Sequence, residues 1–517
     1  MTVKVYKKML LGVLTILLVV FVLNILLNGW IKHQLPTIIN EKNDTSYFIT
    51  YKKLEVSLLR RCIFAQNIVV VPKSSLKDNI SKKGIYANIQ TIEIKDINVW
   101  NLIFSNKIKA STIGIKSPNI IVYDNNNHYS VRNSVVAPFE KIIKVSNILL
   151  SNGNLKVLSK NEAVPILSVN NINFNLEGIK ITEEILNKKI PLEYENYTIS
   201  CDSLFYHPNS FYNLKTNKVN ITKNTTQINN FEMIPAFSRR EFVSKLTNEK
   251  DIYTLLCKSI SLKNSNWGFR GDDFFFHCNL ITLDNVNANI YRSKEPTDDL
   301  SKKHLYNKLL RDLKFDLQVD TLKVQNSKLV YEEEKNSEIG AGVLRFNDFN
   351  LTATSLNSGF KKEKLSDVKI AIHCKFMKNS PFTVNWSFNV LDKRDGFKIQ
   401  GKLGNFEAQQ INAFTKPYMN VTTKGILDEV RFNFSGNDLK SSGQFAVQYD
   451  DLKFTVYQKD ARKKKNKVLS FIANIFVKDD TKDKITETTI EVDRNPEKSF
   501  YNFLWISVAE GLKKILL

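Results

Sequence analysis

The stretch that decides the fold is Ile260-Ser-Leu-Lys-Asn-Ser-Asn-Trp267, and three other stretches share its pattern. They are Ile113-Gly-Ile-Lys-Ser-Pro-Asn-Ile120, Ile148-Leu-Leu-Ser-Asn-Gly-Asn-Leu155 and Leu322-Lys-Val-Gln-Asn-Ser-Lys-Leu329. Each reads apolar–x–apolar, then a polar residue, then Asn or Ser with a small neighbour, then apolar again. Because successive strand residues point to opposite faces, the pattern predicts strands with one apolar face and one polar face.

The polar centre of each stretch predicts a corner. Asn, Ser, Gly and Pro supply turn chemistry, because they tolerate left-handed backbone or cap their own backbone. The four stretches start at irregular intervals along the chain, which argues against a fixed-period solenoid. We therefore expect one arrangement, strand–corner–strand, to be reused along a long sheet.

The last third of the chain alternates most clearly. Residues 384–390 and 397–403 alternate on either side of Asp392-Lys-Arg-Asp-Gly396, which predicts a β-hairpin. Three further sets each place large apolar groups on one face: Val430, Phe432, Phe434; Phe445, Val447, Tyr449; and Leu452, Phe454, Val456. Helical or irregular segments are expected at 232–249, at 305–315, and from about 406 to Pro417.

A single-span anchor is expected at the N-terminus. Met9–Leu27 is an almost unbroken apolar run that would reach roughly 28 Å as a helix, close to the thickness of a bilayer core. Lys4, Lys7 and Lys8 precede it, which places the short N-terminus in the cytoplasm. A cleaved signal peptide is the alternative, but no small-x-small site follows the run.

The C-terminal residues predict an amphipathic helix. The residues Phe500, Phe503, Leu504, Val508, Leu512, Ile515 and Leu516 recur at helical spacing beside two lysines. Such a helix could cap the open end of the sheet, or it could contact a membrane or a partner helix.

Composition excludes several classes of protein. The net charge is +22, but the excess lysine is scattered, so we expect no nucleic-acid partner. The densest basic cluster, at 462–467, is expected to be an exposed loop, with contact to phospholipid headgroups as the alternative. The five cysteines form no CxxC pair, and Cys257 and Cys278 are expected either to pair or to remain buried thiols.

Chemistry-bearing motifs are lacking. The six histidines are isolated, and the sequence has no HExxH, GxSxG, Walker or GxGxxG motif. We expect no enzyme activity, no catalytic residues, no metal and no cofactor.

Several segments together resemble the AsmA-like proteins of diderm bacteria. After the anchor come Tyr51-Lys-Lys-Leu-Glu-Val-Ser-Leu-Leu, Ala65-Gln-Asn-Ile-Val-Val-Val, Ile92-Glu-Ile-Lys-Asp-Ile-Asn-Val and the Ile113 stretch. Near the end, Thr423-Lys-Gly-Ile-Leu-Asp-Glu-Val-Arg-Phe-Asn-Phe-Ser-Gly-Asn and Asp493-Arg-Asn-Pro-Glu-Lys-Ser-Phe-Tyr-Asn-Phe-Leu-Trp are similar to the family's terminal repeat and ending.

The resemblance implies a bacterial inner-membrane protein with a single N-terminal span and the bulk of the chain in the periplasm. It implies a folded-over β-sheet with an apolar trough, related to bridge-like lipid-transfer proteins. Phospholipid and membrane would then be partners, in outer-membrane biogenesis or homeostasis.

The predicted fold is mainly β. A transmembrane anchor (1–30) leads into a long, curved, mostly antiparallel sheet folded into an open apolar groove (31–380), a C-terminal groove segment (381–490) and an amphipathic helix (491–517). Folding of the sheet onto itself as a sandwich is the alternative.

The predicted function is to hold or move phospholipid in the groove. The residues expected to face lipid are Trp267, Phe269, Trp386, Phe388, Phe432, Phe434, Phe445 and Phe454. The alternative function is a membrane-anchored scaffold that carries no lipid and binds envelope proteins through sheet edges or the C-terminal helix.

Overall fold

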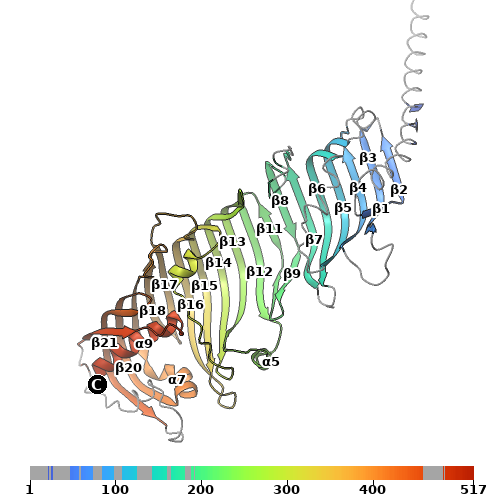
Figure 1. Ribbon diagram of the computed structural model, residues 1–517. Helices are drawn as coiled ribbons and strands as arrows, with labels where there is room; N and C mark the ends of the chain where they lie inside the picture. Colours follow the sequence, from blue (N-terminus) through green and yellow to red (C-terminus); the bar gives the residue numbers. More distant parts are fainter. Residues whose placement is uncertain are drawn as a thin grey trace, which may run out of the picture. The chain divides into compact units, whose positions relative to one another are not determined.

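A computed structural model of the chain describes residues 47–57, 60–73, 84–97, 108–124, 143–159, 165–180, 188–190, 192–457 and 484–516, with a few isolated positions elsewhere. The fold is mainly β, with a long, mostly antiparallel sheet and a few short helices, as predicted (Figure 1). Two compact units can be separated. Unit 1 is Met1–Pro208 with Thr216–Lys223, and unit 2 is Asn209–Lys215 with Asn224–Leu517. The predicted division at 380 and 490 stays a prediction.

Unit 1 is built of strands whose neighbours in the sheet are mostly neighbours in sequence. The strands are β1 (Tyr47–Thr50), β2 (Lys53–Ser57), β3 (Cys62–Pro72), β4 (Gly84–Lys95), β5 (Ile108–Asp124), β6 (Ile143–Ser159), β7 (Pro165–Glu177), β8 (Asn196–Cys201), β9 (Ser203–Asn209) and β11 (Val219–Thr222). Both β8 and β9 pair with β7, at opposite ends of that strand.

Unit 2 contains the remaining strands and the helices α5, α6, η3, α7 and α9. The strands are β10 (Tyr212–Thr216), β12 (Thr225–Pro235), β13 (Asp251–Arg270), β14 (Asp273–Ser293), β15 (Asp316–Glu334), β16 (Ala341–Asn357), β17 (Val368–Phe376), β18 (Ser380–Phe388), β19 (Phe397–Glu407), β20 (Val421–Gly436), β21 (Lys440–Val456) and β22 (Thr486–Asp493). The helices are α5 (Arg239–Ser244), α6 (Tyr306–Arg311), the 3-10 helix η3 (Ala408–Ile411), α7 (Asn412–Met419) and α9 (Phe500–Leu516).

Among the strand pairs whose register is described, two neighbouring pairs depart from the antiparallel rule. β5 and β6 run parallel in unit 1, and β14 and β15 run parallel in unit 2. The predicted hairpin is present, because β18 and β19 pair antiparallel with Val384 opposite Gly401. The predicted helical segment before Pro417 is η3 followed by α7. It runs on to Met419, with Pro417 inside the helix.

The predicted corners are bends inside single strands. The fifth residue of each of the four stretches has a left-handed backbone: φ is 49° at Ser117, 54° at Asn152, 52° at Asn264 and 53° at Asn326. Asn and Ser accept this conformation more readily than β-branched residues. Each stretch lies within one continuous strand, so the prediction of two strands joined by a turn was wrong in that detail.

The bends keep apolar residues on one face of the sheet. Strand β17 has no left-handed residue, so Ile372 and Phe376 lie on the same face. Their partners in β16 are Leu351 and Phe346, which are five residues apart and would face opposite ways in a regular strand. Asp348, with φ 46°, lies between them and shifts the alternation by one.

The same order of bends occurs in both units. In each unit, left-handed residues of four strands lie beside one another across the sheet, and we call the line that joins them the bend line. They are Asn67, Ser117, Asn152 and Asn171 in β3, β5, β6 and β7, and Asn230, Asn285, Asn326 and Asp348 in β12, β14, β15 and β16. The strand between the first and second of these, β4 in unit 1 and β13 in unit 2, has no left-handed residue on the bend line. Its left-handed residue comes six positions later, at Asp96 just after β4 and at Asn264 in β13. The two units therefore share one five-strand pattern, in which the third and fourth strands form the parallel pair.

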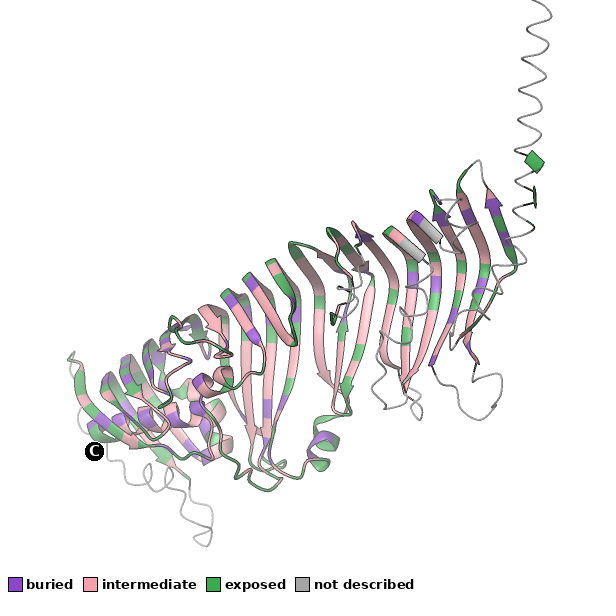
Figure 2. Ribbon diagram, turned by 45° about the horizontal axis from the view of Figure 1, so that its top comes forward, coloured by how far each residue is buried: buried purple, intermediate pink, exposed green. Residues whose placement is uncertain are grey.

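A hydrogen bond at the bends repeats as well. The backbone N–H of Asn152 donates to Asn173 Oδ1 at 3.2 Å, and the backbone N–H of Asn326 donates to Asn350 Oδ1 at 3.1 Å. These side chains satisfy donors that the bend removes from the strand ladder. Figure 2 shows the strands curving, with buried residues interspersed along them.

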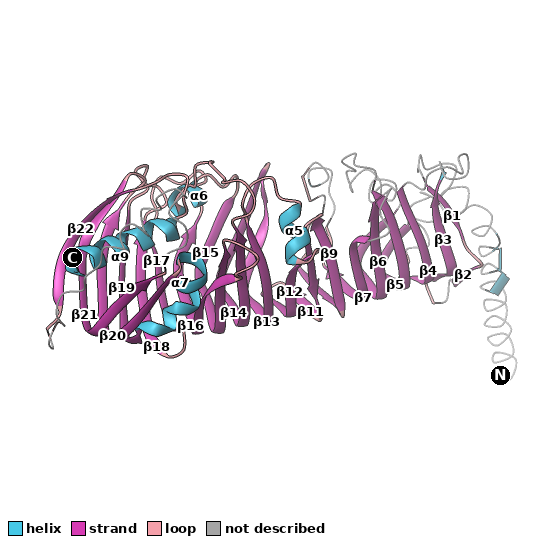
Figure 3. Cartoon of the chain, turned by 90° about the horizontal axis from the view of Figure 1, so that it is seen from below, coloured by secondary structure: helices cyan, strands magenta, loops and turns pink. Residues whose placement is uncertain are grey.

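The largest core lies at the C-terminal end of unit 2. Helix α9 packs on β21 and β22, and side chains of α6 join the same cluster (Figure 3). The cover over this part of the sheet is therefore helical.

Candidate functional site

One face of the unit 2 sheet is apolar across seven strands, β12 to β18. Register partners from strand to strand form a central row of Ile228, Ile260, Leu283, Val324, Leu351, Ile372 and Val384. A second row beside it consists of Thr226, Leu262, Ile281, Leu322, Ala353, Ile370 and Trp386. We call the face that carries both rows the apolar face.

The opposite face is polar. The row between the two apolar rows contains Ser261, Thr282, Lys323 and Thr352, which point the other way because they occupy the alternate positions. This arrangement matches the prediction of strands with one apolar and one polar face.

Burial changes along the central row. Ile260, Leu283 and Val324 are half-buried, and in the described part of the chain none of them belongs to a cluster of buried residues. At the other end of the rows, Val384 and Trp386 are 7% and 9% exposed. The row thus runs from partly exposed positions into a closed core.

Five of the residues predicted to face lipid lie in the closed core instead. Trp386, Phe388, Phe432, Phe434 and Phe445 are all at most 9% exposed and belong to the cluster that α9 covers. They lie on the predicted face, but α9 packs against it there. They form protein core and do not line an open groove.

Two predicted residues are exposed on the apolar face. Trp267 and Phe269 are 44% and 38% exposed. Trp267 lies five residues beyond Leu262, and the left-handed Asn264 between them returns it to the same face. The ring of Phe269 lies 5.5 Å from that of Phe274 on the paired strand, so aromatic groups gather at this end of β13 and β14. The last predicted residue, Phe454, is half-buried against the C-terminal core.

Helix α9 presents a face that differs slightly from the predicted one. Phe500 and Phe503 are buried, as expected from the spacing, whereas Leu504, Val508 and Leu512 are only partly buried against the core. Sequence reasoning missed the small residues Ser507 and Gly511, which are also buried. A Cβ on Gly511 would come within 2.3 Å of the Phe445 ring, so the helix approaches closely at that point.

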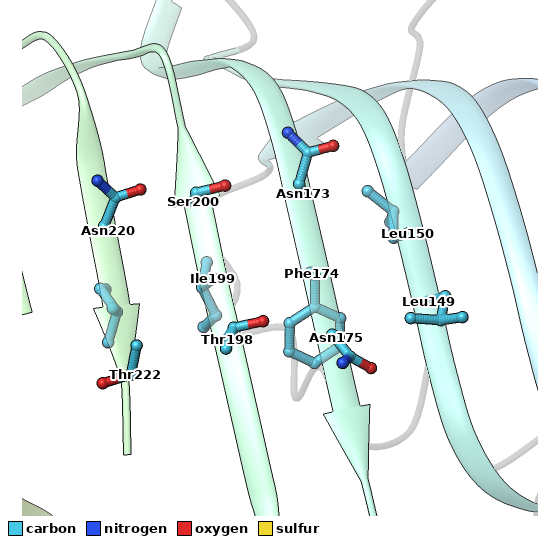
Figure 4. Close-up of a pocket in the computed structure, with 11 residues that line it drawn as sticks. Leu149, Leu150, Asn173, Phe174, Asn175, Thr198, Ile199, Ser200, Asn220 and Thr222 are labelled. Atoms are coloured by element: carbon cyan, nitrogen blue, oxygen red, sulfur yellow. The ribbon is translucent and has the colours of Figure 1, made fainter. Parts of the chain in front are cut away.

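Unit 1 carries a row of the same kind. Its register partners are Leu54, Ala65, Ile92, Ile115, Leu150, Phe174, Ile199 and Ile221. A shallow hollow of about 360 Å³ lies over β6, β7, β8 and β11 and is lined by Leu150, Phe174 and Ile199 together with amide and hydroxyl side chains. Figure 4 shows these residues side by side on neighbouring strands.

A second group, missed by sequence reasoning, lies at one end of β13, β14 and β15. The register brings Asp251, Arg292 and Glu333 together, and Tyr253 and Tyr331 follow two residues further in. We call these five residues, with Lys294, the polar rim. Arg292 Nε donates to Asp251 Oδ1 at 2.7 Å, and Tyr331 donates its hydroxyl to Glu333 at 2.9 Å.

Lysine and helix α7 complete this network. Lys294 Nζ lies 2.5 Å from Glu249 and 3.3 Å from Glu333, and Tyr418 of α7 donates to Glu333 at 2.9 Å. Burial and the neighbouring Asp251 raise the pKa of Tyr253 to about 12, so its hydroxyl is protonated at neutral pH. Tyr253 donates to Asp251 at 3.2 Å, as Tyr331 and Tyr418 donate to Glu333.

In the described residues, no set of three His, Cys, Asp or Glu side chains could hold a metal ion. His277 Nε2 lies 3.0 Å from a carboxylate oxygen of Asp316, and Arg270 and Lys362 also contact that carboxylate. Cys257 and Cys278 are buried free thiols, and burial raises the pKa of both.

The predicted anchor falls almost wholly outside the described residues, as does the basic cluster at 462–467. Among the positions that are described, no helix is both long and apolar enough to cross a bilayer.

Fold and site together define a class of protein. Its members are built on a bent, mostly antiparallel sheet whose two units share one pattern of bends, and each unit has an apolar face. No protein-family model and no curated protein sequence matches the chain.

Proposed function

We propose that the chain is a membrane-anchored, periplasmic lipid-binding protein that holds or moves phospholipid acyl chains along its apolar face. One observation carries the proposal: the central row stays apolar on every strand from β12 to β18, while Ile260, Leu283 and Val324 remain partly exposed. The resemblance to AsmA-like proteins, an inner-membrane anchor at Met9–Leu27 and a role in the outer membrane belong to the same proposal.

Physical chemistry favours an acyl chain as the occupant. Removing apolar surface from water stabilises by about 25 cal/mol for each Å², so each further 100 Å² covered is worth about 2.5 kcal/mol. A row of methyl and methylene groups gives no directional contact, which suits a flexible hydrocarbon better than a ligand with fixed polar groups. The groove would run along the rows, across the strands.

The test places a charge on the row without touching the closed core. The full chain is extracted in mild detergent, and its bound lipid is measured by mass spectrometry. We expect Leu283→Asp to lose most of the bound phospholipid, because a carboxylate on the apolar face would have to be desolvated. Thr282→Asp is the matched control, since Thr282, the residue before Leu283 in β14, points to the polar face.

Two results would refute the proposal. One is a wild-type chain that carries no lipid. The other is equal lipid content in Leu283→Asp and Thr282→Asp, with circular dichroism showing that both variants are folded.

The scaffold alternative has one observation in its favour. Tyr501 and Trp505, one turn apart on α9, are 63% and 41% exposed, and large exposed aromatic groups are common at protein interfaces. It predicts that Tyr501→Ala with Trp505→Ala loses a partner protein in a pulldown while lipid content is unchanged.

A further inference from the structure

The polar rim lies on the apolar face. Phe346 shares that face with its β17 partner Phe376, and its β15 partner Leu329 therefore lies there too. Tyr331 and Glu333 follow Leu329 at alternate positions and so point the same way. Charged and hydroxyl groups thus end a face that is otherwise apolar.

The corresponding row of unit 1 is apolar. When the bend lines of the two units are matched, Tyr253, Ile290 and Tyr331 correspond to Ile85, Val122 and Val157. The repeated pattern of bends therefore does not itself require tyrosine there. The two tyrosines are therefore particular to unit 2, whereas the next row outward is polar in both units, with Asp124 and Ser159 at the positions of Arg292 and Glu333.

Four of the six rim side chains reach solvent, and the Glu333 side chain beside them is 13% exposed. Arg292, Asp251 and Lys294 have side chains 24%, 23% and 22% exposed, and Tyr253 is 41% exposed. Arg292 binds Asp251 through Nε, and within the described part of the chain its two Nη groups make no hydrogen bond. Those two groups have the fork geometry that binds a phosphate through two oxygens.

The rim carries both signs of charge. Arg292 and Lys294 are cations, and three carboxylates lie within salt-bridge distance of them: Asp251, Glu333 and the buried Glu249. A ligand with only a negative charge would gain the cations but face the carboxylates. A zwitterion can place its phosphate by Arg292 and its ammonium by Glu333, so that each charge meets its opposite.

The strand between the rim and the apolar rows also suits an acyl chain. One leaflet contributes about 15 Å of the bilayer's hydrocarbon core, which four or five residues of extended strand would span. Counted from Tyr253, that length passes Leu255 and ends near Cys257, three residues before Ile260 of the central row. An acyl chain anchored at the rim would therefore lie against apolar side chains on its way to the central row, where the groove continues across the strands.

We propose that the polar rim binds the headgroup of a zwitterionic glycerophospholipid, with Arg292 and Lys294 on the phosphate and Glu333 and Asp251 on the ammonium. This inference rests on the proposed function, because it assigns a headgroup site to the acyl-binding face. It adds selectivity, which the apolar rows alone cannot give.

The experiment compares two probes that share an acyl chain. Delipidated full-length protein is loaded with fluorescent acyl-labelled phosphatidylethanolamine or with acyl-labelled diacylglycerol, and retained probe is measured after gel filtration. We expect wild type to retain about tenfold more phosphatidylethanolamine, as one charge-assisted contact would provide. The double variant Asp251→Asn/Arg292→Gln keeps net charge, and it should lose this preference while retaining diacylglycerol as wild type does.

Two further variants complete the test. Lys402→Gln/Glu429→Gln removes a comparable ion pair, 2.6 Å long on the polar face, and should keep the preference. Tyr253→Phe, which removes a single exposed hydroxyl, should lower the preference severalfold and serves where the double variant does not fold.

The possible failures are distinguishable. Equal retention of both probes by wild type, or an unchanged preference in the rim variants, would overturn the headgroup site and leave the proposed function standing. Acyl-labelled phosphatidylglycerol, which carries only a negative charge, serves as a third probe, and its retention at the level of phosphatidylethanolamine would overturn the choice of a zwitterion. Failure of wild type to retain either probe would remove both proposals.

Discussion

The Phe500 ring of α9 stacks on the Trp386 indole of β18, with centroids 4.7 Å apart and planes inclined by 11°. This contact joins the C-terminal helix to the second apolar row, where that row enters the closed core. The residues under the helix are therefore expected to control stability, and the residues beyond it to control any ligand.

Replacement of Phe500 should destabilise the protein strongly. Phe500 is 5% exposed, and truncation of a buried phenylalanine costs about 3–5 kcal/mol through lost burial and the cavity left behind. Urea unfolding of Phe500→Ala followed by tryptophan fluorescence measures this loss. The neighbouring Tyr501→Ala removes a ring that is 63% exposed and should cost less than about 1.5 kcal/mol. Equal losses would show that α9 does not pack on the sheet.

Gly401 should be intolerant of any side chain. It pairs with Val384, and a Cβ there would come within 2.1 Å of the Phe432 ring, so Gly401→Ala should cost at least about 1–3 kcal/mol by overpacking. Gly404 on the same strand has its nearest neighbour at 3.7 Å from a Cβ, and Gly404→Ala should be nearly neutral. A double-mutant cycle with Phe432→Leu should recover part of the loss, and additivity would contradict the contact.

The bends should depend on left-handed backbone. Asn326 has φ 53°, and its side chain donates to Asp284 Oδ1 at 2.8 Å. We expect Asn326→Ile to lose about 2 kcal/mol of unfolding free energy, and Asn326→Gly to lose less, since glycine adopts positive φ without strain. Lys323→Ile, in the same strand with ordinary backbone, is the control. A loss as large for Lys323→Ile as for Asn326→Ile would argue against the bend.

The sequence predicted the bends in part because the chemistry is local. A short run of Asn, Ser or Gly between alternating apolar residues favours a left-handed residue, and Ser117, Asn152, Asn264 and Asn326 all have one. Whether the chain turns back or continues as one strand depends on pairing with neighbours, which no local pattern contains. The stretches were therefore interpreted as two strands where there is one.

The candidate site shows the same limit. Alternation placed Trp386 and Phe445 on the correct face, but it could not tell whether a helix or a ligand covers that face. Small buried residues such as Gly511 carry no apolar signal. The polar rim was missed because Asp251, Arg292 and Glu333 are distant in sequence and meet only through the register of β13, β14 and β15.

Acid should weaken unit 2 partly through Asp316. Burial acts to raise the pKa of Asp316, but bonds from His277 and Lys362 outweigh burial and hold that pKa below its usual range. A carboxylate with a lowered folded-state pKa stabilises above its unfolded pKa of about 3.9, and this contribution disappears as pH falls through the folded value. Urea unfolding between pH 6 and pH 2 should show a smaller acid-dependent loss for Asp316→Asn than for wild type. Identical slopes would contradict the linkage.

The most direct measurement of the central claim is site-specific photocrosslinking in membranes. A benzophenone side chain placed at Val324 on the central row should form an adduct with the mass of a phospholipid, whereas the same group at Lys323, one residue away on the polar face, should not. Lipid adducts at Val324 alone would support acyl chains on the apolar face. Protein adducts at Val324, or equal lipid labelling at both positions, would contradict it.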